Sequence, residues 1–467
     1  PAARSPRGPG DVNTPQDAHR ASGPDDPIAC TNTRTTEGAP MAEFAAEVYQ
    51  NEFLSEGATD VHAIVTVTCR GAGSAGSAGG AGGGAEIIMG DTSGSMSGRN
   101  IEAAKHAAQV AVDQILDGTW FAIVGGSHVA NRAFPYPNAR MAMVQMEPGA
   151  RAEAKRAISM LTPGGGTAMS TWLRLADQLF ATVPQATQRH AILLTDGKNE
   201  SEPRANLSAA VRDVTGHFQC DARGVGSRGQ GDELREISPA LLGTGDLIAD
   251  PNEIAADFEK LMQTSMARGV ASADLRVWAP QGSQVLFVRQ VAPTVEDLTH
   301  RRAEVNPLTG AYPTGSWGDE SRDYHVAVRV ASKPVGSEQL AARVQLAVNG
   351  EVVSSGLVKA KWSDDESLTT RINPEVAHYT GQTELAAAIQ EGLAAKASGD
   401  EATATVKLGR AVQLAQQTGN EEATSRLRKV VEIDDEEHGT VRLKRNTSTL
   451  DEMALDTAST KTTRVRR

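Results

Sequence analysis

The sequence predicts an α/β protein with a doubly wound, mostly parallel sheet, joined to a β-sandwich and a small C-terminal helical domain. Three observations support this fold class. Residues 85–268 alternate apolar runs with amphipathic stretches, which is typical of a parallel sheet covered by helices on both faces. Residues 269–365 carry alternating apolar and polar runs separated by turn residues, which favours an antiparallel sandwich. Residues 373–435 show apolar side chains at helical spacing.

Length and composition narrow the class of protein. The 467 residues are enough for about two to four domains. The net charge of −12 disfavours nucleic acid or an anionic membrane as the main partner. Three cysteines form no disulfide framework, which is typical of a reducing compartment. No apolar run reaches the length of a membrane span, and no secretory signal is recognisable, so we expect a cytoplasmic protein.

The N-terminal part of the chain divides into three segments. Residues 1–40 lack periodicity and are expected to be a disordered extension, with Met41 as a plausible natural start. Residues 41–70 are expected to form strands that join the sandwich, which would insert the α/β domain into it. A separate N-terminal β-arm is the alternative. Residues 71–84 are a Gly-rich linker.

The predicted elements of the α/β domain, residues 85–268, follow in order. Asp250 and Pro251 give the last helix a typical start, with a capping carboxylate before proline at the first helical position. The expected strands lie at 85–90, 120–124, 191–194 and 218–224, and the expected helices at 101–116, 150–161, 169–181, 206–214 and 251–266.

The C-terminal half contains the sandwich, the helical region and a tail. Asn349-Gly350 is a strong hairpin signal between two of the sandwich strands, which are expected at 274–278, 283–288, 324–330 and 340–348. Three apolar stripes between residues 382 and 433 predict a helical hairpin plus a further helix. Residues 436–467 are rich in Thr and polar, and are expected to be a disordered tail.

Five side chains from three segments predict a metal-ion site. Asp91, Ser93 and Ser95 follow the first predicted strand of the α/β domain. Thr167 lies in a Gly-rich loop, and Asp196 follows the 191–194 strand. Open α/β sheets bind ligands at the edge where parallel strands end. Two carboxylates and three hydroxyls are hard oxygen ligands, which suit Mg²⁺ or Mn²⁺.

This pattern of Asp-x-Ser-x-Ser, a loop Thr and Thr-Asp-Gly resembles the von Willebrand factor type A (VWA, integrin I-like) family. The resemblance implies a metal-ion-dependent adhesion site with Asp91, Ser93, Ser95, Thr167 and Asp196 as the ligating positions. It also implies a non-enzymatic protein-binding module whose partner presents an Asp or Glu to the metal. The sparse cysteines and the lack of a recognisable signal favour an intracellular member over a secreted adhesin, and the resemblance is to a bacterial-type member of the family.

Other functions stay open at this stage. A metal-dependent hydrolase is one alternative, and a VWA subunit assisting an AAA+ or chelatase-type complex is another. Against catalysis, Ser93 and Ser95 lack the flanking glycines of a nucleophile elbow. His62, His106, His128, His190 and His217 have no metal-ligand spacing and are expected to be packed or surface residues; none is assigned a catalytic role.

The Thr-rich tail suggests a third hypothesis, a signalling scaffold. Ser448 and Thr449 have acidic residues three positions on. Phosphorylation by a Ser/Thr kinase would add negative charge there, and a phosphothreonine-binding forkhead-associated domain could then dock. Such regulation is compatible with a metal-dependent binding module.

Overall fold

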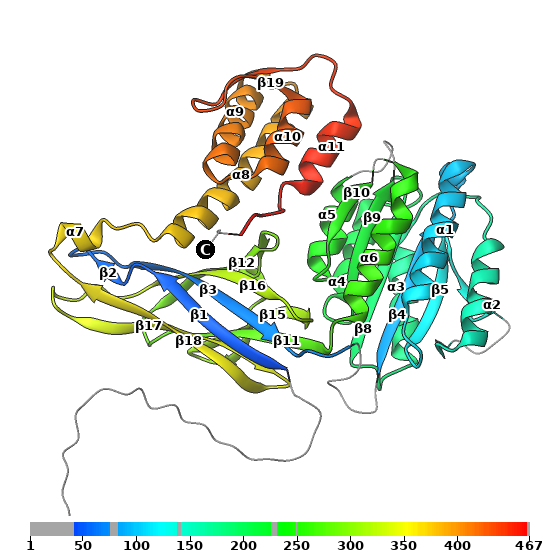
Figure 1. Ribbon diagram of the computed structural model, residues 1–467, viewed down its shortest axis with the longest axis horizontal. Coiled ribbons are helices and arrows are strands. Elements are labelled where there is room, and N and C mark those ends of the chain that lie inside the picture. Colours follow the sequence, from blue (N-terminus) through cyan, green and yellow to red (C-terminus); the bar gives the residue numbers. More distant parts are fainter. Residues whose placement is uncertain (1–41, 75–82, 138–141, 226–230, 249, 465–467) are drawn as a thin grey trace, which may run out of the picture. The chain divides into compact units, whose positions relative to one another are not determined.

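The computed structural model describes residues 42–74, 83–137, 142–225, 231–248 and 250–464 (Figure 1). The predicted extension at 1–40 and most of the Gly-rich linker lie outside the described residues. The predicted α/β fold class is confirmed, with further sheets and a C-terminal helical region. No helix in the described part of the chain is both long and apolar enough to cross a membrane.

The α/β domain is built on one sheet with the strand order β10-β9-β8-β4-β5-β6. Neighbouring strands from β10 to β5 are parallel, whereas β6 and the short β7 pair with β5 in the antiparallel sense. The strands are β4 (Gly84–Asp91), β5 (Trp120–Gly126), β6 (Ala130–Phe134), β7 (Val144–Gln145), β8 (Gln188–Thr195), β9 (Gln219–Val225) and β10 (Gly245–Ile248).

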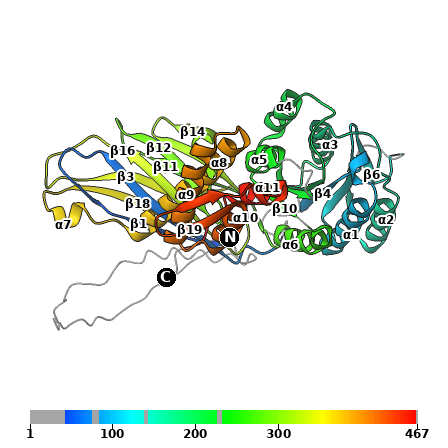
Figure 2. The same cartoon turned by 90° about the horizontal axis from the view of Figure 1, so that it is seen from above.

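Helices cover both faces of this sheet, as Figure 2 shows from above. One buried cluster joins the sheet to α3, α4 and α5, and includes Trp172, Leu207 and Leu234. A second joins it to α1, α2 and α6, and includes Ala154 and Phe258. The helices are α1 (Arg99–Gln114), α2 (Pro148–Ser159), α3 (Met169–Ala181), α4 (Arg204–Val214), α5 (Gly231–Ala240) and α6 (Ile254–Met266), with 3₁₀ turns η2 (Gly94–Met96) and η3 (Pro251–Glu253).

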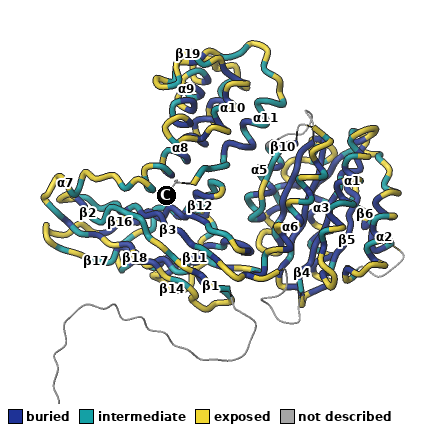
Figure 3. Tube along the Cα trace, viewed as in Figure 1, coloured by how far each residue is buried: buried dark blue, intermediate teal, exposed yellow. Residues whose placement is uncertain are grey.

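Two antiparallel-rich sheets form the β-sandwich, with orders β1-β3-β16-β12-β13 and β14-β15-β11-β17-β18-β2. Their facing side chains form one continuous core, visible as buried segments in Figure 3. The strands are β1 (Glu43–Gln50), β2 (Phe53–Leu54), β3 (Asp60–Arg70), β11 (Val270–Trp278), β12 (Gln284–Ala292), β13 (Glu296–Asp297), β14 (Ala303–Asn306), β15 (Thr309–Trp317), β16 (Ser321–Arg329), β17 (Glu338–Val348) and β18 (Glu351–Trp362), with a 3₁₀ turn η4 (Thr299–Arg301).

The N-terminal strands are central to this sandwich. β3 pairs antiparallel with β16 along nine residues, from Asp60 opposite Arg329 to Thr68 opposite Ser321. β1 pairs in turn with β3. Because β3 precedes the α/β domain and β11 follows it, the α/β domain is inserted between two strands of the sandwich.

The helical region begins after a short helix α7 (Glu366–Thr369). Its helices are α8 (Pro374–Ala397), α9 (Glu401–Gln417) and α10 (Glu421–Val430), followed by a hairpin of β19 (Val431–Asp435) and β20 (Thr440–Leu443). Each long helix has a side-chain cap, because Asn373, Asp400 and Asn420 accept hydrogen bonds from backbone N–H groups in the first turn. Leu385, Leu408 and their neighbours form a separate core.

The prediction of a disordered tail at 436–467 is wrong for the described residues up to 464. Residues 440–443 form β20, and α11 (Thr449–Ala458) follows. The Ser448 side chain caps α11 by accepting a hydrogen bond from the Asp451 backbone, so it is part of the fold. Leu455 is 1% exposed and Thr457 is 5% exposed. A short apolar face packed on the rest of the molecule therefore orders a segment whose composition is mostly polar.

Residues 459–464, here called the C-terminal strap, connect three parts of the molecule. The backbone of Val295 donates a hydrogen bond to the Thr460 carbonyl at 2.7 Å, which ties the strap to the sandwich. Lys461 Nζ forms an ion pair with Asp246 of β10 in the α/β domain at 2.5 Å. The Thr462 hydroxyl donates to the Val291 carbonyl of the sandwich at 2.6 Å, and His378 Nε2 of α8 hydrogen-bonds to the Thr463 carbonyl at 2.7 Å.

Candidate functional site

Asp91 is the last residue of β4 and is held by two hydrogen bonds. Its Oδ1 accepts the backbone N–H of Ser93 at 2.7 Å, and its Oδ2 accepts the Thr195 hydroxyl of β8 at 2.6 Å. β4 and β8 are parallel neighbours, so their carboxyl ends meet at the same edge of the sheet. The side chain is 1% exposed and therefore buried at that edge.

Asp196 directly follows β8 and meets the loop after β4. Its Oδ1 accepts the Ser95 hydroxyl at 2.6 Å, and its Oδ2 accepts the Asn100 side-chain amide at 2.7 Å. The Ser93 and Ser95 hydroxyls lie 2.8 Å apart. Four of the five predicted residues are thus linked through one chain of short polar contacts.

Thr167 comes from a loop that is tied to the same edge by its backbone. The N–H of Gly94 donates to the Gly165 carbonyl at 2.8 Å, and the N–H of Gly164 donates to the Thr92 carbonyl at 2.8 Å. Reciprocal bonds between the main chains of the two loops fix their distance. The Gly-rich composition allows this approach, because a Cβ on Gly94 would lie only 3.3 Å from the Gly165 carbonyl.

Gly197 reveals how close the predicted side chains come to one another. A Cβ at this position would lie 3.3 Å from Ser95 Oγ, 3.4 Å from Thr167 Oγ1 and 4.0 Å from Asp91 Oδ2. The absence of a side chain at Gly197, the residue after Asp196, therefore leaves a small space bordered by oxygens of Ser95, Thr167 and Asp91. The structure brings together every side chain that the sequence assigned to the site.

The charge of the site is unbalanced. Asp91 and Asp196 are each 1% exposed, and within the described residues neither forms an ion pair with Lys or Arg. Burial raises the pKa of Asp91, and the neighbouring Asp196 carboxylate adds to that increase. Two buried carboxylates beside hydroxyl oxygens fit a small divalent cation, since a cation would remove their repulsion. Within the described residues, no group of three or more His, Cys, Asp or Glu side chains is arranged so that it could hold a metal ion.

Sequence reasoning missed two residues that hold the carboxylates. Thr195 was noted only as part of the Thr-Asp-Gly motif, yet its hydroxyl bonds Asp91 and accepts the Gly197 N–H at 3.2 Å. Asn100 lies five residues beyond Ser95, the last motif hydroxyl, and carries no signal of its own. A helix beginning at residue 99 would have placed it on the first turn above the site.

A second buried polar cluster lies near the amino ends of the same strands. His190 Nδ1 lies 2.7 Å from Glu86 Oε2, and its Nε2 lies 2.9 Å from Asp221 Oδ2. The Ser265 hydroxyl of α6 donates to Glu86 at 2.5 Å. Burial alone would lower the pKa of His190, but the two carboxylates outweigh it and raise the pKa to about 9. His190 was expected to be a packed or surface residue; it is buried between two carboxylates, which favour its protonated form.

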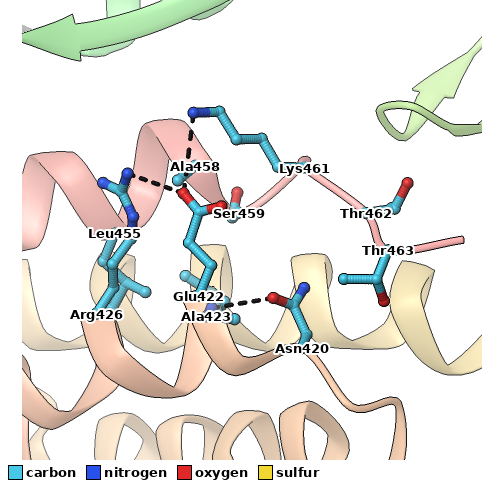
Figure 4. Close-up of a pocket in the computed structure, with 11 residues that line it drawn as sticks. Asn420, Glu422, Ala423, Arg426, Leu455, Ala458, Ser459, Lys461, Thr462 and Thr463 are labelled. Atoms are coloured by element: carbon cyan, nitrogen blue, oxygen red, sulfur yellow. Dashed lines mark hydrogen bonds and ion pairs between the residues drawn. The ribbon is translucent and has the colours of Figure 1, made fainter.

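The C-terminal strap borders a small pocket beside α10 (Figure 4). Glu422 lies 3.0 Å from Arg426 and 4.0 Å from Lys461, so it joins α10 to the strap. The cavity of about 30 Å³ has room for roughly one water molecule. This pocket is a structural junction between the strap and the helical region.

Comparison with known proteins agrees with this architecture. The family model of the von Willebrand factor type A domain matches residues 86–246, and that of the von Willebrand factor type A C-terminal domain matches residues 413–459. A von Willebrand factor type A protein of solved structure, from Catenulispora acidiphila, is 44% identical. The match covers 92% of this chain and 99% of that one, with a TM-score of 0.85.

Two more distant proteins extend the comparison. The ArnB paralog VWA2 from Sulfolobus acidocaldarius is 15% identical over 90% of this chain and 98% of its own, with a TM-score of 0.53, so the likeness concerns the fold. The uncharacterized protein sll0103 of Synechocystis is 29% identical over 215 residues, or 45% of this chain. The chain spans about half the length of that curated relative, 49%.

The protein therefore combines an α/β domain of a protein-interaction class with a β-sandwich and a helical region. The chain belongs to the von Willebrand factor type A family. In general, a domain of this family is a protein-interaction module.

Proposed function

We propose that this protein binds Mg²⁺ or Mn²⁺ at Asp91, Ser93, Ser95, Thr167 and Asp196, and binds an Asp or Glu of a protein partner through that metal. One observation carries the proposal. Two buried carboxylates have no ion pair with a described Lys or Arg, and they lie beside hydroxyls that are linked to them by hydrogen bonds or border the space left by Gly197. A divalent cation is the ligand that such a set of oxygens and charges fits best.

The donor set also explains why a partner would be needed. A bound cation would supply Lewis acidity, since the three hydroxyls are neutral and only Asp91 and Asp196 offset its charge. Each oxygen of these two carboxylates already accepts one hydrogen bond and keeps lone pairs for a further contact. Ser95 donates its proton to Asp196 and accepts one from Ser93, so one lone pair of Ser95 remains for a cation.

The surrounding loop favours metal-dependent recognition of an anion. Glu200 and Glu202 follow Asp196 closely, and Glu202 is held by the backbone and hydroxyl of Ser170. These carboxylates repel an acidic partner when no cation is present. A partner Asp or Glu would bind only where a metal offsets that repulsion, which makes binding switchable by chelation.

We assign no catalytic role to the site. The Ser93 and Ser95 hydroxyls bond to each other, and Ser95 also donates to Asp196. Within the described residues, no hydrogen bond joins a histidine to either serine. A serine nucleophile needs an adjacent base oriented for proton transfer. The arrangement therefore serves ligand binding better than hydrolysis.

Calorimetric titration with MnCl₂ and MgCl₂ tests the metal site. We expect one weak site in the wild type and none in Asp91→Ala. Asp177→Ala is the matched control, because Asp177 is a carboxylate on α3 that pairs with His217 instead. If Asp91→Ala and the wild type bind the metal equally well, the metal binds at another site.

Affinity purification from native cells tests the partner. We expect a protein that is retained with Mg²⁺, is released by EDTA, and is absent from Asp91→Ala samples. Neutralising single Asp and Glu residues of that protein should then identify the one that reaches the metal. Retention in EDTA, or a partner unaffected by every such substitution, would contradict recognition through a carboxylate.

A further inference from the structure

Asn100 lies outside the five predicted ligands but touches one of them. It is the second residue of α1, and its side-chain Nδ2 donates to Asp196 Oδ2 at 2.7 Å. The other oxygen of Asp196 accepts the Ser95 hydroxyl. Asn100 is therefore one of two side chains that fix how the Asp196 carboxylate is turned.

The local backbone brings Asn100 to this position. Gly98 has φ = 88°, in the left-handed region that favours glycine, and it directly precedes α1. α1 starts directly after this residue, and its first turn brings Asn100 to Asp196, which follows the carboxyl end of β8. The approach of Asn100 to Asp196 thus depends on a backbone conformation that few other residues adopt.

The chemistry of the amide suits this task. An amide donor is neutral, so it orients a carboxylate without cancelling the negative charge that attracts a cation. A Lys or Arg here would neutralise Asp196 and compete with the metal. Within the described residues, Asp196 has no such cationic neighbour within ion-pair distance.

We infer that Asn100 is a positioning residue for the metal site, which holds Asp196 in the orientation needed for divalent-cation binding. This inference rests on the proposed metal site. Residues that orient metal ligands typically change metal affinity by roughly 10–100-fold when removed. Because Asn100 is partly buried at the start of a helix and lies outside the hydrophobic core, its removal should weaken metal binding without unfolding the domain.

The test is the Mn²⁺ affinity of the full chain, measured by calorimetry, for wild type, Asn100→Ala and Asn100→Leu. Leucine has the same branching of heavy atoms as asparagine but has no donor. We expect both variants to bind Mn²⁺ about tenfold or more weakly, with melting temperatures in EDTA close to that of the wild type. Gln109→Ala is the control, because it removes another amide of α1 that bonds Lys155 and Ser159 instead.

The outcomes separate this inference from the proposed function. Wild-type affinity in Asn100→Ala and Asn100→Leu would overturn the positioning role and leave the metal site intact. Equal weakening in Gln109→Ala would attribute the effect to α1 stability and would also overturn it. If the wild type itself binds no Mn²⁺ or Mg²⁺, the proposed metal site fails and the inference fails with it.

Discussion

The buried Glu86–His190–Asp221 cluster should make the α/β domain less stable as the pH rises. Burial lowers the pKa of His190, but the Glu86 and Asp221 carboxylates outweigh that effect. In the folded protein they raise the pKa from 6.5 to about 9. Below pH 6.5 the imidazole is protonated in both folded and unfolded chains, and its contribution is complete. That contribution is lost as the pH rises through about 9. At about 1.4 kcal/mol per pH unit, the loss is roughly 3 kcal/mol.

Substitution tests the same cluster directly. His190→Gln keeps a similar volume but removes the positive charge between two buried carboxylates. Breaking a buried ion pair in this way typically lowers the free energy of unfolding by about 3–5 kcal/mol. We therefore expect His190→Gln to destabilise the domain at pH 6.5 by about 3 kcal/mol. His217→Ala, which removes a half-exposed histidine paired with Asp177, should change stability by less than about 0.5 kcal/mol.

The assay must report on the α/β domain alone, since the chain has several cores. Pulse-labelling hydrogen exchange across a urea series, read on peptides covering β4 and β8, gives the unfolding midpoint of this domain at each pH. Wild-type stability that stays level between pH 6.5 and 9.5 would refute an imidazolium at His190. So would a His190→Gln variant as stable as His217→Ala.

Three further changes probe other parts of the structure. Asp196→Ala should abolish Mn²⁺ binding, and its melting temperature in EDTA should equal or exceed that of the wild type because repulsion with Asp91 is removed. A fall in melting temperature as large as that caused by truncating a core side chain would show that the site is structural. Gly126→Ala should destabilise the α/β domain by about 1–3 kcal/mol in urea unfolding, since its Cβ would lie 2.4 Å from the Trp172 ring; an unchanged midpoint would contradict that contact. Leu455→Ala should lower the free energy of unfolding by about 2–5 kcal/mol, because Leu455 of α11 is buried. Calorimetric melting measures this change, and an unchanged melting curve would mean that the tail is disordered.

The sequence predicted the strongly periodic elements best. β4, β8 and α3 carry long apolar runs or stripes, and their positions follow from hydrophobic periodicity. α5 was missed because Pro239 lies inside it, and β10 was missed because it has only four residues. β15 contains Gly310, Pro313 and Gly315, which read as turn residues rather than as an inner strand.

The candidate site was predictable in composition but not in its supporting contacts. Strand ends and motif spacing place Asp91 and Asp196 at one edge, and the structure brings them together there. Asn100 and Thr195 act through side-chain hydrogen bonds between segments about a hundred residues apart, which no local pattern encodes. The same holds for His190, whose role depends on partners from two other strands.

The insertion of the α/β domain between β3 and β11 has a consequence for synthesis on the ribosome. Thr68 of β3 and its neighbour Ser321 of β16 are 253 positions apart in the chain. At about 5–20 residues per second, roughly 10–50 s pass between the synthesis of β3 and the synthesis of β16. During that interval the apolar residues Val61, Ile64 and Val67 lack the later segments that bury them, including the facing sheet and α8. The α/β domain is completed within the same interval, so its chain is made before the sandwich can close, and β3 exposes apolar side chains until then.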